Sequence, residues 1–207
     1  MLVLTLFKLG FFLAGISSLF LGLFIFLQNR ASIINKTYFG LSVGSAIWSF
    51  GFLGLISSTN VEQAYILRTL MDAGAIVLPA FWIHFVYVIT EHKVALIELI
   101  SYYIWAIVIL SFNFLDYFYR GLFVNDIISN NIFPYYPTAS FGYYLFVAFY
   151  IFIIPYSLYL LIKGYRGSSD VKKRQIKYLI LGALFGFFGG STAFLYTFGI
   201  NIPPYGI

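Results

Sequence analysis

Six long and nearly uninterrupted apolar runs constrain this chain more than any other feature of its sequence. They lie at residues 9–27, 38–56, 64–89, 94–115, 142–162 and 176–200. Each is long enough for a helix to cross the hydrocarbon core of a bilayer, which takes about 20 apolar residues. None shows the short alternating segments of a membrane β-barrel. The sequence therefore predicts an all-α fold, a polytopic transmembrane helical bundle of six spans that forms a single membrane domain over residues 1–207.

The composition excludes a water-soluble particle. Hydrophobic residues make up 61% of the chain and charged residues 9%, against about 25% charged residues in an ordinary soluble domain. There is no cysteine, which removes disulfide frameworks and thiolate metal centres. No nucleotide-binding, hydrolase or metalloprotease motif is present. We expect a lipid bilayer as partner, no nucleic acid, no metal or other cofactor, and no enzymatic activity.

Basic residues indicate how the bundle is oriented. Nine of the twelve lie in or beside the first, third and fifth connections between the spans: Arg30, Lys36, Lys93, Lys163, Arg166, Lys172, Lys173, Arg174 and Lys177. Lysine and arginine gather on the cytoplasmic side of membrane proteins. The N-terminus is therefore predicted to lie outside, as is the long connection at 116–141. No small-residue cleavage site follows Leu27, so the first run is interpreted as a retained helix and not as a signal peptide.

One ionisable pair lies inside a predicted span. Asp72 is the only acid well within an apolar run, and Arg68 precedes it by four residues, on the same helix face. A charge at membrane depth usually faces a partner or a cavity. The pair is either a proton or ligand relay, or an i, i+4 contact that holds neighbouring helices in register. The position near the predicted outer end of its helix favours the second interpretation.

Three further residues complete the candidate ligand-sensing set of Arg68, Asp72, His84, Arg120 and Asp126. His84 either forms a hydrogen bond across a helix interface, which we favour, or responds to pH. Arg120 and Asp126 lie in the long outer connection. Catalysis by Asp72 and His84 together is disfavoured, because twelve helical residues separate them by about 18 Å.

Glycines at a spacing of four mark two helix faces that allow close packing. The helix-packing candidates are Gly40, Gly44, Gly182, Gly186 and Gly190. These faces pack either inside the bundle or between protomers, and we expect a homodimer.

Two segments together resemble the N-terminal seven-transmembrane sensor region of bacterial histidine kinases. The first comprises Asn35-Lys36-Thr37-Tyr38-Phe39, Ala46-Ile47-Trp48-Ser49-Phe50-Gly51, Glu62, Arg68, Gly74, Leu78-Pro79 and Phe85. The second comprises Arg174-Gln175-Ile176-Lys177-Tyr178, Gly182 and Gly199-Ile200-Asn201-Ile202-Pro203-Pro204. The resemblance covers nearly the whole chain.

The resemblance implies a sensory input module in a bacterial plasma membrane, with its N-terminus outside. In that family a PAS, histidine-kinase or diguanylate-cyclase module follows in the cytoplasm. This chain stops before the expected seventh helix, which favours a fragment that lacks its output module over a stand-alone six-helix protein. The alternative function is a small multi-pass transporter or permease subunit. That alternative needs inverted repeats and helices interrupted at midplane, and neither is evident.

Overall fold

The computed structural model describes residues 2–129 and 132–200 of the chain. Along them follow α1 (Leu2–Gln28), α2 (Ile33–Leu55), α3 (Val61–Ile89), α4 (Leu96–Leu115), β1 (Val124–Ile128), β2 (Tyr136–Ala139), α5 (Phe141–Arg166), α6 (Asp170–Ala183), the π-helical segment η1 (Leu184–Phe188) and α7 (Gly189–Thr197). Six helical segments of this described part are long and apolar enough to cross a membrane, with α6, η1 and α7 forming the sixth. The predicted six-span helical bundle is confirmed.

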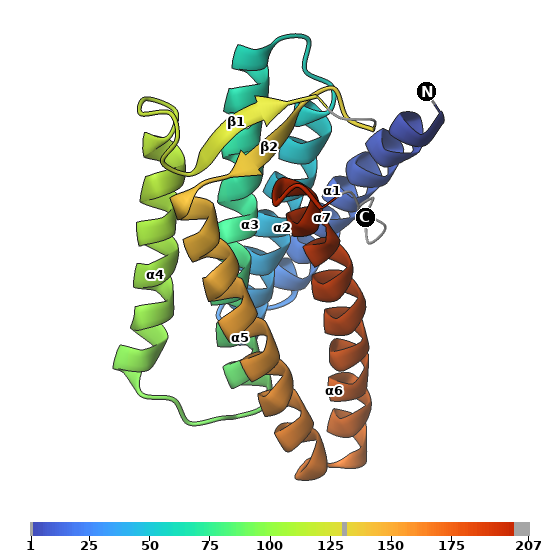
Figure 1. Cartoon of the computed structure of the whole chain (residues 1–207). Coiled ribbons are helices and arrows are strands. Elements are labelled where there is room, and N and C mark those ends of the chain that lie inside the picture. The colour runs from blue at the N-terminus through green and yellow to red at the C-terminus, as the bar shows by residue number, and fades with distance from the viewer. Residues whose placement is uncertain (1, 130–131, 201–207) are drawn as a thin grey trace.

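Helix α3 lies at the centre of the bundle. It packs against α2, α4 and α5, and residues from Ala64 to Tyr87 along its length are buried. Helix α1 packs on the other face of α2. Helix α6 stands apart from this group and runs beside α5 (Figure 1). Most buried helix residues therefore lie in α2, α3 and α5, and α1, α4 and the sixth span lie around them.

Glycine allows α2 and α3 to approach to backbone contact. A Cβ atom added to Gly74 would lie 2.6 Å from the carbonyl oxygen of Gly44, and one added to Gly51 would lie 2.5 Å from the backbone nitrogen of Met71. Real Cβ atoms do not come so close, so a larger side chain at either position would push the helices apart. This crossing fixes α3 against α2 over most of its length.

The glycines singled out from the sequence fall into two groups. Gly40 and Gly44 face α3, where added Cβ atoms would meet the ring of Phe81 and the side chain of Val77. Around Gly182, Gly186 and Gly190 no described atom lies close enough to touch an added Cβ. The second group therefore packs against nothing in the part of the bundle that the structure describes, and its alternative role between protomers stays a prediction.

Capping side chains set a helix start that hydropathy cannot locate. The expected third span began at residue 64, whereas α3 begins at Val61. The side chain of Asn60 accepts a hydrogen bond from the backbone nitrogen of Gln63 at 2.8 Å, and the Gln63 side chain accepts one from the backbone nitrogen of Thr59 at 3.0 Å. These reciprocal bonds satisfy donors at the helix N-terminus, so the helix extends beyond the apolar run.

The sixth span differs most from its expected form. It was expected as one helix over residues 176–200, but α6 already begins at Asp170, so Lys172, Lys173 and Arg174 lie in its first turns. The span is then interrupted by η1. Carbonyl oxygens of this segment receive hydrogen bonds from side chains: the Tyr150 hydroxyl donates to Phe187 at 2.5 Å. Such π segments are rare and occur mostly as single turns inside α-helices, frequently at functional sites.

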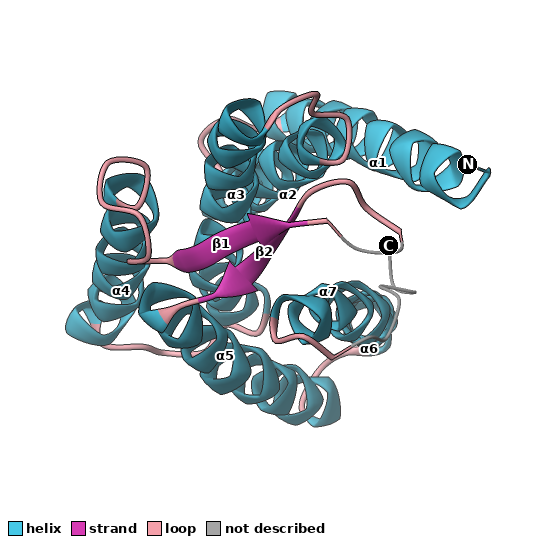
Figure 2. Cartoon of the chain, turned by 45° about the horizontal axis from the view of Figure 1, so that its top comes forward, coloured by secondary structure: helices cyan, strands magenta, loops and turns pink. Residues whose placement is uncertain are grey.

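The long connection contains a β-hairpin that the sequence analysis did not anticipate. Strands β1 and β2 pair antiparallel, with Val124 opposite Ala139 and Ile128 opposite Tyr136, and with a bulge between. The hairpin lies across one end of the bundle (Figure 2). Its aromatic rings are buried against the helices: the centroid of Phe133 lies 5.8 Å from that of Phe52. The bundle is therefore closed at this end by packed structure and not by a loose loop.

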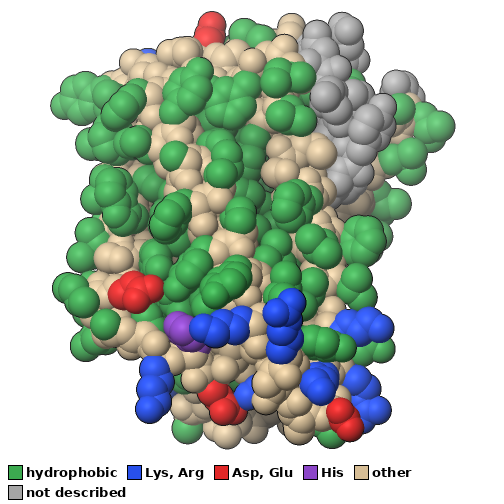
Figure 3. All heavy atoms as spheres, turned by 60° about the horizontal axis from the view of Figure 1, so that its bottom comes forward, with side chains coloured by type: hydrophobic (Ala, Val, Ile, Leu, Met, Phe, Trp, Pro, Cys, Tyr) green, Lys and Arg blue, Asp and Glu red, His purple; other side chains and the backbone are tan. Residues whose placement is uncertain are grey.

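The two ends of the bundle differ in charge. The hairpin end carries the start of α1 and the end of α7, and the α3–α4 and α5–α6 connections lie at the opposite end (Figure 1). Lysine and arginine side chains gather at that opposite end (Figure 3). There the Lys172 ammonium donates to Glu91 at 2.6 Å, and this hydrogen bond lowers the pKa of the exposed Glu91 carboxyl. By the rule that predicted the orientation, this basic end faces the cytoplasm and the hairpin lies outside, and that orientation stays a prediction.

Cysteine labelling tests this orientation cleanly, because the chain has no cysteine of its own. Ile128→Cys places a thiol on an exposed position of β1, and Ser169→Cys places one at the α5–α6 turn. In intact cells a membrane-impermeant maleimide is expected to label the first variant and to leave the second unlabelled until the cells are opened. Labelling of Ser169→Cys alone in intact cells would contradict the orientation.

Candidate functional site

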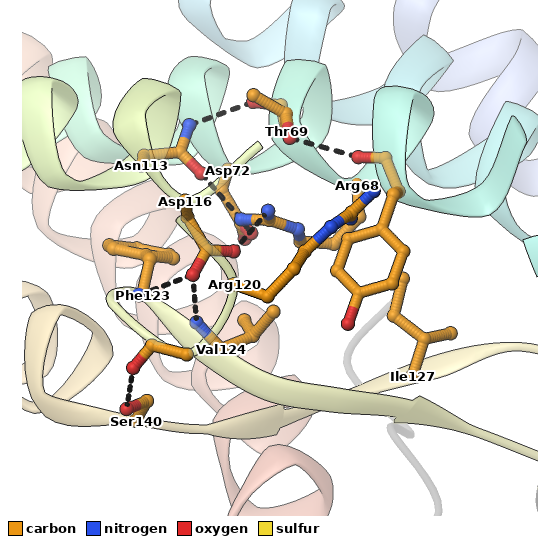
Figure 4. A network of polar contacts seen from close by, with 12 residues as sticks. Arg68, Thr69, Asp72, Asn113, Asp116, Arg120, Phe123, Val124, Ile127 and Ser140 are labelled. Atoms are coloured by element: carbon orange, nitrogen blue, oxygen red, sulfur yellow. Dashed lines mark hydrogen bonds and ion pairs between the residues drawn. The ribbon is translucent and has the colours of Figure 1, made fainter. Parts of the chain in front are cut away.

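The side chain of Arg68 is buried in the hairpin half of α3 and is fully enclosed, with 0% of its surface exposed. Its Nη2 atom donates to Asp116 Oδ2 at 2.7 Å. Its Nη1 atom donates to Asn113 Oδ1 at 2.6 Å and to Asp72 Oδ2 at 3.3 Å. Figure 4 shows these side chains converging on the guanidinium. One cation thus joins α3 to the end of α4.

Local helix geometry places the four side chains of this cluster, which we call the Arg68 network (Arg68, Asp72, Asn113 and Asp116). Arg68 and Asp72 lie one turn apart on α3. Asn113 lies in the last turn of α4, and Asp116 caps its C-terminus. The Asn113 amide also donates to the carbonyl oxygen of Thr69 at 2.9 Å, so α3 and α4 are joined by an uncharged hydrogen bond as well.

Asp116 also anchors the hairpin. Its Oδ1 atom accepts hydrogen bonds from the backbone nitrogens of Phe123 at 2.8 Å and Val124 at 3.4 Å. The carbonyl oxygen of Phe123 in turn accepts from the backbone nitrogen of Ser140, just before α5. A single carboxylate therefore connects the α3 guanidinium to the start of β1, and the hairpin continues the connection to α5.

A second ion pair lies at the surface beside the network. Arg120 Nη2 lies 3.1 Å from Glu62 Oε2, with 36% and 60% of the two side chains exposed. The Arg120 guanidinium carbon also lies 3.4 Å from the centroid of the Tyr65 ring. A hydrogen bond to Glu62 raises the pKa of the neighbouring Tyr117, so that phenol stays protonated. This pair contacts Tyr65 beside the network and is itself exposed to solvent.

The five candidate sensing residues do not form one cluster. Arg68 and Asp72 belong to the network. Arg120 is near it, because the guanidinium groups of Arg68 and Arg120 both lie close to the ring of Tyr65. Asp126 is exposed on β1, where its carboxylate accepts from the next backbone nitrogen at 2.7 Å. His84 lies elsewhere: its Nδ1 atom is 2.8 Å from the Tyr103 hydroxyl of α4, so it joins two helices. Among the described residues no three His, Cys, Asp or Glu side chains are placed to hold a metal ion.

Sequence reasoning missed Asn113 and Asp116. The expected fourth span, residues 94–115, contains Asn113, and Asp116 opens the long connection that follows it. Their spacing of three residues, which puts two polar side chains on one face at a helix end, was the available signal. Their partner on α3 could be found only from the way the two helices pack.

These features define a polytopic helical membrane protein in which a buried ion network joins a β-hairpin to one end of the bundle. Residues 11–207 match the family model described as the N-terminal 7TM region of histidine kinase. The chain therefore belongs to this family, as its resemblance implied. No curated protein and no solved structure gives a significant match. The matched range contains the hairpin and the whole Arg68 network. The motif residues 201–204 lie outside the described residues.

Replacing Arg68 by alanine is expected to destabilise the fold strongly, because the buried Asp116 carboxylate and the Asp72 carboxyl group would lose their cationic partner. Removing one partner of a buried ion pair costs about 3–5 kcal/mol. Arg120→Ala is the matched control, since exposed pairs contribute about 0–1 kcal/mol. Reversible unfolding in detergent micelles measures both. Equal losses of stability in the two variants would show that the network does not support the fold.

Proposed function

We propose that this chain is the sensory input region of a histidine-kinase-type receptor in a bacterial plasma membrane. Its output module would lie in the cytoplasm and in the same polypeptide. The observation that carries the proposal is membership of the family of N-terminal 7TM regions of histidine kinase, over residues 11–207. The six apolar helical segments agree with an input module embedded in lipid.

The hairpin is the part best placed to receive a stimulus. Through Asp116 it is bound to α3 and α4. Through Phe133 it packs against Phe7 of α1, at a centroid distance of 5.2 Å, and against Phe52 of α2. The Tyr136 hydroxyl donates to the carbonyl oxygen of Ala193 in α7 at 2.8 Å. A change in the position of the hairpin therefore alters its contacts with five helices at once.

The sixth span is the best candidate to carry the change across the membrane. Near the hairpin it is held by Tyr136 and by the Tyr143 hydroxyl of α5, which donates to Thr197 at 3.2 Å. Towards the opposite end most of α6 is exposed, so little packing opposes its movement. A stimulus acts on such an element only if it binds the two arrangements with different affinity.

We further propose that the receptor acts as a homodimer. The stripe of Gly182, Gly186 and Gly190 has no neighbour among the described residues. Small residues at this spacing suit close approach of another helix in a membrane. A second copy of the sixth span would place two signal-carrying helices side by side.

The anchoring residue Asp116 offers a direct test in the full-length gene product. The coding sequence is expected to continue past Ile207 into a cytoplasmic kinase or cyclase. Asp116→Asn keeps the shape of the side chain but removes the charge that binds Arg68, so basal output is expected to change several-fold. Asp126→Asn, at an exposed position of the same hairpin, is expected to leave output unchanged. Autophosphorylation or cyclic dinucleotide synthesis in membranes measures both.

Two results would contradict the proposal. The first is a coding sequence that encodes no output module. The second is the same output from wild type and Asp116→Asn when both are inserted at equal levels. Deletion of the whole hairpin is a poorer test, because Phe123, Phe133 and Tyr136 are buried core residues and their loss would disturb the bundle itself.

A further inference from the structure

The Arg68 network lacks one positive charge. It contains one guanidinium and two carboxylates, whose exposed fractions are 0% for Arg68, 2% for Asp72 and 0% for Asp116. With every group ionised its net charge is +1 − 2 = −1. A buried charge without compensation is unfavourable, and a buried group commonly gains or loses a proton instead. The cation of the neighbouring connection, Arg120, is already paired with Glu62.

The two carboxylates are held very differently. Asp116 accepts from the Arg68 guanidinium at 2.7 Å and from two backbone nitrogens, and several donors favour the charged form of a carboxyl group. Asp72 has one contact in the network, at 3.3 Å, with an Nη1 atom that is bound more closely by Asn113 at 2.6 Å. Asp72 is therefore the carboxyl group that loses least by taking up a proton.

Among the residues that the structure describes, no other group around Asp72 supplies the missing charge. The groups that face it are Arg68 on its own helix, Asn113 and Asp116 at the end of α4, Tyr136 on β2 and Tyr143 on α5. The hydroxyl hydrogens of Tyr136 and Tyr143 are already donated to α7. Burial raises the pKa of Tyr136, so its phenol is neutral.

The guanidinium shows the same imbalance. Its Nε donor is buried and has no acceptor among the described residues, although Asp72 lies one turn away. A fully charged Asp72 carboxylate would be attracted to this free donor. The Asp72 carboxyl group makes no hydrogen bond to this Nε donor, which agrees with a neutral carboxyl group.

We propose that Asp72 is a proton-binding site, where the carboxyl group takes from water the proton that makes the buried network neutral. Loss of this proton leaves a second carboxylate that competes with Asp116 for Arg68. Because Asp116 anchors β1, the hairpin is then held less tightly. That this proton acts as a stimulus for the output module rests on the proposed function; the binding of the proton does not.

Infrared difference spectroscopy of the purified chain in micelles tests the site without any output module. As pH rises, wild type and Asp126→Asn are expected to lose the C=O absorption of a buried protonated carboxyl group. Asp72→Asn is expected to lack this transition, and its amide should fold as a neutral mimic of the acid. The same transition at full amplitude in Asp72→Asn would overturn the proposal.

A second variant keeps the test decisive if Asp72→Asn fails to fold. Asp116→Asn removes the competing carboxylate, so Asp72 has Arg68 to itself and should lose its proton at a lower pH than in wild type. An unchanged midpoint would place the titrating group outside the network. A transition that follows this pattern while receptor output ignores pH would support the proton site and count against the signalling role alone.

Salt distinguishes a proton from a small cation. If Na⁺ or K⁺ supplies the missing charge, wild type shows no carboxyl transition, and its stability rises with the concentration of that ion while Asp72→Asn shows no such rise. That result would overturn proton binding. The expected result is a carboxyl transition whose midpoint is little affected by exchanging Na⁺ for K⁺.

Discussion

The burial of the Arg68 guanidinium is the constraint on which this end of the molecule depends. A full charge inside a membrane bundle persists only where partners surround it. Two of those partners, Asn113 and Asp116, come from the end of α4, and Asp116 in turn receives the first backbone nitrogens of the hairpin. The ion network therefore determines how α4 meets α3 and where the hairpin begins.

Close helix packing supplies the framework that holds this charge in place. Gly51 and Gly74 let α2 and α3 touch at their backbones, and α3 becomes the axis against which α4 and α5 pack. Aromatic rings from the hairpin fill the space above α1 and α2. By contrast, few residues of the sixth span are buried. Hydroxyl groups from Tyr136, Tyr143 and Tyr150 and ring contacts at Phe187 and Phe194 hold its η1 and α7 part. A less tightly packed helix beside a rigid core is the arrangement expected if that helix moves relative to the core.

Hydropathy alone was sufficient to predict the six spans, because an apolar run of this length has few alternatives to a membrane helix. It could not locate the start of α3, which depends on hydrogen bonds from Asn60 and Gln63, nor the start of α6 among the lysines. The hairpin escaped prediction because its strands have five and four residues, too short for a pattern to stand out.

The candidate site was predicted only in part, for a physical reason. Arg68 and Asp72 are neighbours on one helix, and helical periodicity revealed them. Asp116 is distant in sequence, and its role follows from tertiary packing. His84 and Asp126 are polar residues of the expected type, but packing directs the first to Tyr103 and leaves the second exposed.

The central claim is that the buried guanidinium holds the hairpin through Asp116. Amide hydrogen exchange at Phe123 and Val124, compared between wild type and Arg68→Gln, tests it most directly. If the account is right, both amides exchange faster in the variant, while amides at the centre of α2 stay protected. Unchanged protection at Phe123 and Val124 in a folded Arg68→Gln protein would show that the hairpin is held by its aromatic contacts alone.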